Sequence, residues 1–293
     1  MTCSITLLSP ADGSVVTKRI TPDGVVPAPL STWYRAVTVP LTGFADLAST
    51  LTTLATVPTW LAVRGSILPG VNTECMRRSH VPPTATLEET PRRWVLLDLD
   101  SVRPDVTADA FASAVAEYAA VARGMLPECF HDAACFYMAT SSAGYKPGIR
   151  LRLGFWLSRA VSSAEWKAWC RGWDVKVDPS LFTPSQPHYT AAPVLEGVPD
   201  PCAGRRTGVL PGGDVQIPAL LVDPREGDKA GEDLRRTCRR SSRRASGTRS
   251  RVCCLYTIRT WWRSLRMRRR CTRSASCHFS RPSDPPGSPM TNG

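Results

Sequence analysis

Two aspartates one residue apart close the most informative stretch of the chain, WVLLDLD, which ends in Asp98 and Asp100. A short run rich in Val and Leu is typical of a buried strand. Because side chains alternate between the faces of a strand, we expect Asp98, Asp100 and Leu96 on one face and Leu97 and Leu99 on the other. Neighbouring carboxylates repel unless a cation lies between them, and oxygen ligands of this kind suit Mg²⁺ or Mn²⁺. The alternative is a strand end with two solvated aspartates.

A third carboxylate, Asp178, closes the segment VKVD, which we expect to be a short strand over 175–178. Three converging acids can hold two divalent ions, one activating an attacking hydroxyl and the other stabilising a leaving pyrophosphate. Taken alone, an Asp-Pro pair is more often a turn at the end of a strand.

The turn SSAGYKPG, over 141–148, joins two expected strands at 135–139 and 149–157. Its small residues allow backbone amides to approach a ligand closely, and the arginines that follow share one face of the second strand. Guanidinium groups there can neutralise a metal-bound triphosphate. The alternative is a β-hairpin turn with exposed arginines. The candidate nucleotide-binding residues of this region are Ser141, Ser142, Gly144, Arg150 and Arg152.

The segment QPHYTAAP, over 186–193, adds His188 and Tyr189, which can contact a nucleotide sugar or phosphate or stack on a base. A lone His beside a Tyr is more often a hydrogen-bonded structural residue. The sequence contains neither a P-loop nor a dinucleotide-binding fingerprint, so ATPase and dehydrogenase activities have no support.

Helices and strands alternate irregularly along residues 1–228, which is typical of an α+β or mixed α/β domain. The spacing of apolar residues and the capping signals predict these elements. We expect helices over 41–54, over 107–123 with Thr107 as its N-cap, and over 162–170 with Ser162 and Glu165 as a capping box, and a strand over 60–65.

The net charge of +12 is concentrated in residues 229–293, which hold 16 Arg, one Lys and three acids. Residues 1–228 are therefore nearly neutral. One interpretation of the segment is a basic arm that binds nucleic-acid phosphates. The other, which we favour, is a GC-rich gene translated out of frame, because the segment combines Arg with paired Trp and scattered Cys rather than with Lys. Either interpretation predicts a disordered tail.

Near the N-terminus no basic region precedes an apolar core, and no stretch is apolar and long enough to cross a bilayer. We therefore expect a cytoplasmic protein without membrane contact, whose 11 cysteines stay reduced. No CxxC pair is present, which argues against a zinc site.

The order of these motifs resembles the catalytic core of the archaeo-eukaryotic primase (primase-polymerase) superfamily, in particular the primase domains of phage and plasmid replication proteins. The combination is far more specific than any one motif, and the similarity spans roughly residues 30–220. The segments that carry it are LAVRG at 61–65, RRWVLLDLD at 92–100, SSAG to LRLGFWLSRAV at 141–161 and VDPSLFTPSQPHYTAAP at 177–193.

The resemblance implies an RRM-like catalytic core with an N-terminal α/β unit, which synthesises primers from nucleoside triphosphates on single-stranded DNA with Mg²⁺ or Mn²⁺. It makes Asp98, Asp100 and Asp178 the metal carboxylates, and it implies a replicative helicase module that this chain lacks. The family's second motif usually supplies a His, whereas Arg152, or alternatively Arg150, stands there in this chain. An Arg can bind phosphate but cannot titrate as an imidazole does.

We expect arginines of the domain to contact the DNA template, Arg64, Arg77 and Arg78 among them. Two alternatives remain open: a degenerate, non-catalytic DNA-binding module of the same fold, and a metal-dependent nuclease that uses the same carboxylates.

Overall fold

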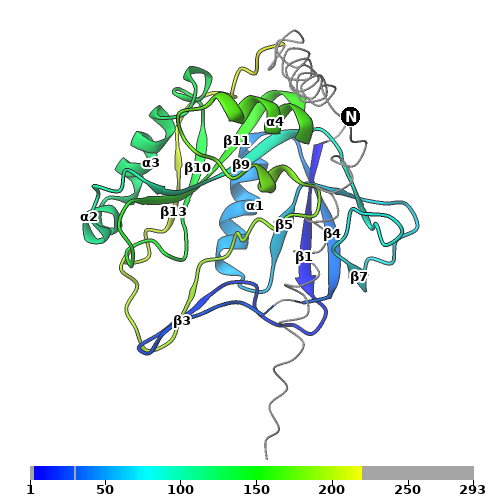
Figure 1. The fold of residues 1–293 in the computed structure, drawn as a ribbon, viewed down its shortest axis with the longest axis horizontal. Helices are drawn as coiled ribbons and strands as arrows, with labels where there is room; N and C mark the ends of the chain where they lie inside the picture. The colour runs from blue at the N-terminus through cyan, green and yellow to red at the C-terminus, as the bar shows by residue number, and fades with distance from the viewer. Residues whose placement is uncertain (1–2, 30, 220–293) are drawn as a thin grey trace, which may run out of the picture. The chain divides into compact units, whose positions relative to one another are not determined.

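The computed structural model describes residues 3–29 and 31–219, which belong to one compact unit. Both interpretations of the segment 229–293, the basic arm and the out-of-frame tail, concern residues outside this described part. The described chain is a mixed α/β structure in which two four-stranded sheets are flanked by short helices (Figure 1). This confirms the expected fold class at the level of an α+β or mixed α/β domain.

The first sheet is formed mainly by the N-terminal part of the chain, and its strands run in the order β5-β1-β4-β7. Strand β1 pairs antiparallel with β4 along its whole length and with β5 on its other side. Its members are β1 (Cys3–Pro10), β4 (Trp33–Leu41), β5 (Leu61–Val63) and β7 (Met76–Arg77).

The second sheet carries the Asp98 motif, and its strands run antiparallel in the order β13-β10-β11-β9. The expected strands at 94–100, 135–139 and 149–157 are all confirmed. Its members are β9 (Arg92–Val102), β10 (Cys135–Ala139), β11 (Ile149–Val161) and β13 (Thr207–Leu210). Short strands form two smaller sheets: β2 (Arg19–Thr21), β3 (Gly24–Val26) and β12 (Val194–Leu195) in one, and β6 (Ser66–Ile67) and β8 (Leu87–Glu88) in the other.

Helix α1 (Phe44–Thr56) lies between the two large sheets (Figure 1). Its apolar stripe, which includes Leu47 and Leu51, packs in one core with residues of both sheets, Leu96 among them. The approach is close at Gly154 on β11, where a Cβ atom would lie 3.0 Å from both Leu51 Cδ1 and Leu96 Cδ2. Glycine at this position therefore allows α1 to approach the sheet.

The other face of the second sheet is covered by α2 (Ala108–Ser113), α3 (Val115–Gly124) and α4 (Ser163–Trp169). Leu97 and Leu99 point into this second core and Leu96 into the first, so the predicted alternation along β9 is confirmed. The helix expected over 107–123 is two helices, because Ala114 leaves helical geometry at φ −135° and ψ 44°. The Thr107 N-cap and the Ser162/Glu165 capping box are both present.

The chain over 175–178 is not the strand that we expected. Asp178 instead caps the short 3₁₀ helix η3 (Pro179–Phe182), accepting the Ser180 backbone N–H at 2.9 Å and the Ser180 hydroxyl at 2.7 Å. Proline at the first position of a helix and Asp before it are a favoured start signal, and here they outweigh the alternating pattern. Two further 3₁₀ turns are η1 (Glu128–Phe130) and η2 (Cys170–Gly172). Within the described ranges, no helix combines the length and apolar character needed to cross a membrane.

Candidate functional site

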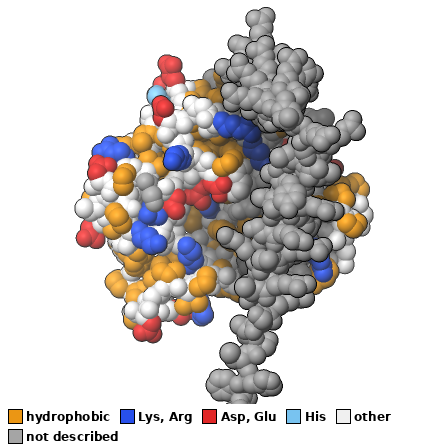
Figure 2. Space-filling view, viewed as in Figure 1, with side chains coloured by type: hydrophobic (Ala, Val, Ile, Leu, Met, Phe, Trp, Pro, Cys, Tyr) orange, Lys and Arg blue, Asp and Glu red, His pale blue; other side chains and the backbone are white. Residues whose placement is uncertain are grey.

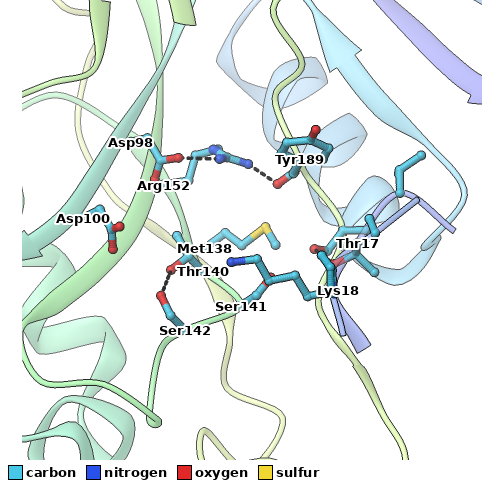
Figure 3. A pocket seen from close by; sticks show the side chains of 14 residues that line it. Thr17, Lys18, Asp98, Asp100, Met138, Thr140, Ser141, Ser142, Arg152 and Tyr189 are labelled. Atoms are coloured by element: carbon cyan, nitrogen blue, oxygen red, sulfur yellow. Dashed lines mark hydrogen bonds and ion pairs between the residues drawn. The ribbon is translucent and has the colours of Figure 1, made fainter. Parts of the chain in front are cut away.

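A cavity of about 300 Å³ opens where the α1-facing side of the second sheet stops being apolar. Along β9 this side runs from Trp94 and Leu96 in the core to Asp98 and Asp100 in the cavity wall. The polar side chains that line the cavity come from the sheet, from the turn after β10, from the N-terminal segment and from the loop before β12: Thr17, Lys18, Asp98, Asp100, Thr140, Ser141, Ser142, Arg152 and Tyr189 (Figure 3).

Two of these groups, Asp98 and Arg152, form a mostly buried ion pair. The two residues are direct partners in the β9–β11 register, and Arg152 donates to Asp98 Oδ2 at 2.7 Å. The Arg152 side chain is only 7% exposed, and its guanidinium also donates to the backbone carbonyl of Tyr189. The second carboxylate oxygen, Asp98 Oδ1, is buried and has no hydrogen-bond partner among the residues that the structure describes.

Asp100 is held by Arg150 in a second pair, but its environment differs from that of Asp98. The Asp100 side chain is 65% exposed at the cavity mouth, whereas Arg150 is 10% exposed. Arg150 also donates to the Pro147 carbonyl at 3.0 Å and to Ser142 Oγ at 3.3 Å. We expected both arginines to face a triphosphate. In the structure each binds a carboxylate, and Arg150 does not line the cavity.

The opposite wall comes from the N-terminal segment, where no motif predicted a functional residue. Thr17 Oγ1 donates to the Ala191 carbonyl at 3.3 Å, and the Val194 N–H donates to the Lys18 carbonyl at 3.0 Å. The exposed Lys18 side chain extends across the cavity toward Ser141 (Figure 3). Lys18 belongs to no motif, and its place in the site depends on pairing with residues more than 170 positions later.

The predicted three-aspartate centre is not formed. Asp178 is exposed, engaged with Ser180, and absent from the cavity wall. Across 3–29 and 31–219 no three His, Cys, Asp or Glu side chains are placed to hold a metal ion together. The unpartnered Asp98 Oδ1 is an oxygen acceptor without a donor, so it could, together with Asp100, serve as a ligand of one divalent ion. Mg²⁺ commonly takes one or two carboxylates and completes its shell with water and phosphate oxygens.

The turn after β10 lines the cavity with serine side chains, whereas its glycine Gly144 does not line it. Ser141 and Ser142 line it, and Ser142 Oγ lies 3.3 Å from Thr140 Oγ1. Gly144, a predicted nucleotide contact, is not in the lining; its φ of +79° and the overlap that a Cβ would make with Pro201 explain the glycine there.

His188 and Tyr189 are neighbours in sequence but lie in different environments. His188 is fully buried against Trp94, and its backbone exchanges hydrogen bonds of 2.7 and 3.1 Å with Ala62. Burial first, and then the charges of Arg152 and Arg64, hold the pKa of His188 well below its usual value. His188 does not line the cavity, whereas Tyr189 is exposed and does.

Of the three arginines predicted to contact DNA, Arg64 is a core residue. It is 1% exposed and donates to the backbone carbonyls of Trp94 at 3.1 Å and Val161 at 3.0 Å, and burial lowers its pKa to about 10. The prediction for Arg64 is therefore wrong, because an arginine with buried carbonyl partners cannot reach a nucleic acid. Arg78 is half-buried and donates to the Ser185 carbonyl, while Arg77 is exposed.

Charge is unevenly distributed over the face shown in Figure 2, where acidic side chains gather near the middle and Lys and Arg side chains lie around them.

Comparisons of the chain with protein-family models, curated proteins and solved structures found no match in any of the three. A functional assignment therefore depends on the cavity and on the motifs that line it.

Proposed function

We propose that this chain is a nucleotidyltransferase of the primase-polymerase type, which joins nucleotides on a single-stranded DNA template during phage or plasmid replication. The observation that carries the proposal is the unpartnered, buried Oδ1 of Asp98 beside the exposed Asp100 carboxylate, across a cavity from Lys18. Carboxylate oxygens on one wall and a lysine ammonium on the other suit a metal-bound triphosphate.

Each wall of the cavity has its own task in this proposal. Asp98 and Asp100 would hold one Mg²⁺ or Mn²⁺, which neutralises phosphate charge when bound. Lys18 would contact phosphate oxygens that the ion does not reach, and the hydroxyls of Ser141 and Ser142 would fix the remaining oxygens. Arg152 orients Asp98, since its guanidinium is shared between that carboxylate and the Tyr189 carbonyl.

The succession of elements around the second sheet, though not its strand order, also supports the proposal. The chain runs β9, α2 and α3, β10, β11, α4 and β13, a β-α-β-β-α-β succession as in ferredoxin-like folds, whose first strand is internal whereas β9 is at an edge. The strand order β13-β10-β11-β9 places the Asp98 strand at one edge of this sheet. An edge position leaves the end of β9 accessible to the cavity.

A non-catalytic DNA-binding module is the second candidate, and one observation favours it. Asp98 and Asp100 are each already paired with an arginine, so their negative charge is balanced without an ion. Among the described residues no histidine lines the cavity, so this part of the chain offers the site no imidazole to act as a base.

Primer synthesis by the full chain separates these candidates. The assay supplies single-stranded DNA, labelled ribo- or deoxynucleoside triphosphates and Mn²⁺ or Mg²⁺. We expect extended products with the unaltered chain and none with D98A/D100A, while D105A, which removes an exposed acid paired with Arg103, retains activity. Salt-dependent DNA binding without incorporation would instead indicate the non-catalytic module, and degradation of DNA without added nucleotides would indicate a nuclease.

A further inference from the structure

A second hollow, which we call the α4 groove, lies along the end of α4 and the loop that follows it. Its volume is about 650 Å³, and it shares no lining residue with the cavity at Asp98. Its lining includes Lys167, Arg171, Trp173, Lys176 and Ser180.

The α4 groove is basic, and within residues 3–29 and 31–219 its cations are not neutralised by acids of its lining. The described residues that line it include no acid. Lys167 donates to the Thr183 hydroxyl at 3.1 Å, and neither Arg171 nor Lys176 forms an ion pair within the part of the chain that the structure describes. By contrast, seven arginines elsewhere in that part are paired with carboxylates: Arg19, Arg35, Arg103, Arg150, Arg152, Arg159 and Arg206.

Two acids of the same loop, Asp174 and Asp178, lie outside the groove lining. Asp178 is engaged with Ser180, and Asp174 is exposed. Both Arg171 and Lys176 are exposed as well, so their charges face solvent. Lys and Arg side chains gather near α4 on the face shown in Figure 2.

An aromatic wall adjoins these cations. The Trp173 ring packs edge-on against Trp169, with ring centres 4.9 Å apart, and against Phe130 at 5.6 Å. These contacts fix the ring while Trp173 still lines the groove. Its indole Nε1 is buried without a hydrogen-bond partner among the described residues.

We propose that the α4 groove binds a single-stranded nucleic acid, with Arg171 and Lys176 on its phosphates and Trp173 against a base. Cations beside a fixed aromatic ring are the combination by which proteins bind single strands without reading their sequence. The inference goes beyond nucleotide transfer at Asp98, since it holds for a catalytic and for a non-catalytic chain. D98A/D100A is accordingly expected to retain this binding.

The first test measures the binding of a fluorescent (dT)20 oligonucleotide to the full chain at several salt concentrations. Each phosphate contact to a single strand contributes about 0.7 to the slope of log affinity against log salt, so R171A/K176A should lower that slope by about 1.4. The control R35A/R103A removes the same charge from exposed positions outside the groove and should leave the slope unchanged. Equal slopes for the two double variants would overturn the proposal.

A second measurement locates the contact in the unaltered chain and does not depend on a variant that folds. Amine-reactive labelling of Lys176, read by mass spectrometry, is expected to fall at saturating (dT)20 but not with dTTP at the same phosphate concentration. Equal protection by dTTP would show a site for free nucleotides, and no protection by either would show that the strand lies elsewhere. Both results contradict the assignment.

Discussion

Arg152 and Asp98 stand opposite one another on β11 and β9, joined by a 2.7 Å ion pair at the point where the sheet leaves the core. The Arg152 side chain is 7% exposed and that of Asp98 is 26% exposed, so the pair lies mostly out of solvent. The neighbouring pair of Arg150 and Asp100 is more open on its acidic side, because Asp100 is 65% exposed. The two aspartates should therefore differ in what they contribute to stability.

Replacing Asp98 by Asn is expected to lower the free energy of unfolding by about 2 kcal/mol, because Arg152 then remains buried without a counter-charge. D100N should cost less than about 1 kcal/mol, as is typical of an ion pair with an exposed partner. Urea unfolding of the two variants at neutral pH measures both values. A larger loss for D100N than for D98N would contradict the burial difference on which this prediction depends.

Lys18→Ala tests whether the N-terminal wall takes part in nucleotide binding. Because Lys18 is exposed, the substitution should change stability by less than about 0.5 kcal/mol. Loss of an ammonium from a phosphate should weaken binding of a manganese–nucleotide complex about tenfold, which corresponds to about 1.4 kcal/mol. Calorimetric titration measures the affinity. The control K146A removes a lysine that is exposed but outside the cavity lining, and equal affinities for K18A and K146A would remove Lys18 from the site.

His188 should make the protein sensitive to mild acid. Its pKa is lowered in the folded chain, so below the unfolded value of about 6.5 the unfolded chain binds a proton that the folded one does not. The stability present at neutral pH is then lost as the pH falls from about 6.5, by up to about 1.4 kcal/mol for each pH unit.

His188→Phe keeps an aromatic ring beside Trp94 and removes the titrating group, so this acid loss should shrink between pH 6.5 and 5. Chemical unfolding across that range measures it. H80Q, at an exposed histidine, should retain the loss seen in the unaltered chain. If H188F followed the same pH curve as H80Q, another group would be responsible.

Gly154→Ala should destabilise the protein by about 1–3 kcal/mol, since the new methyl group meets Leu51 and Leu96 side chains at 3.0 Å. The matched change G124A, at the end of α3 where no atom lies within 4 Å of a new Cβ, should stabilise by about 0.5–1 kcal/mol. Thermal unfolding compares the two. The double variant L51A/G154A should lose less stability than the sum of the losses of the two single variants, because the smaller side chain at position 51 leaves space for the new methyl group.

Local patterns predicted the strands and helix caps well, because each depends on neighbours in sequence. The alternation in WVLLDLD placed Asp98 and Asp100 on the same side of β9, and the Ser162/Glu165 capping box formed as expected. The strand predicted over 175–178 was wrong because the alternating pattern there competed with a stronger local signal, the Asp-Pro start of η3.

The cavity itself could not be assembled from local patterns. Whether an arginine faces solvent or a buried carbonyl depends on which distant backbone comes near it, and for Arg64 those partners lie 30 and 97 residues away. Lys18 differs from Arg64 in the opposite way: it belongs to no motif, yet pairing between distant segments places it in the wall of the cavity. Sequence reasoning thus found one wall and missed the other.

The stretch after His188 runs back along the N-terminal part of the chain, where Val194 pairs with Arg19 and Ala192 donates to the Ala55 carbonyl. It ties the Lys18 side of the cavity to the Arg152 side, through the Thr17 bond to Ala191 and the Arg152 bond to Tyr189. During synthesis on the ribosome, the first 19 residues can therefore form these contacts only after almost the whole domain has been translated. Contacts between residues so distant in sequence favour slow folding. A nascent chain halted before residue 189 would lack the segment that joins the two walls of the cavity, so Asp98 and Asp100 would be more exposed.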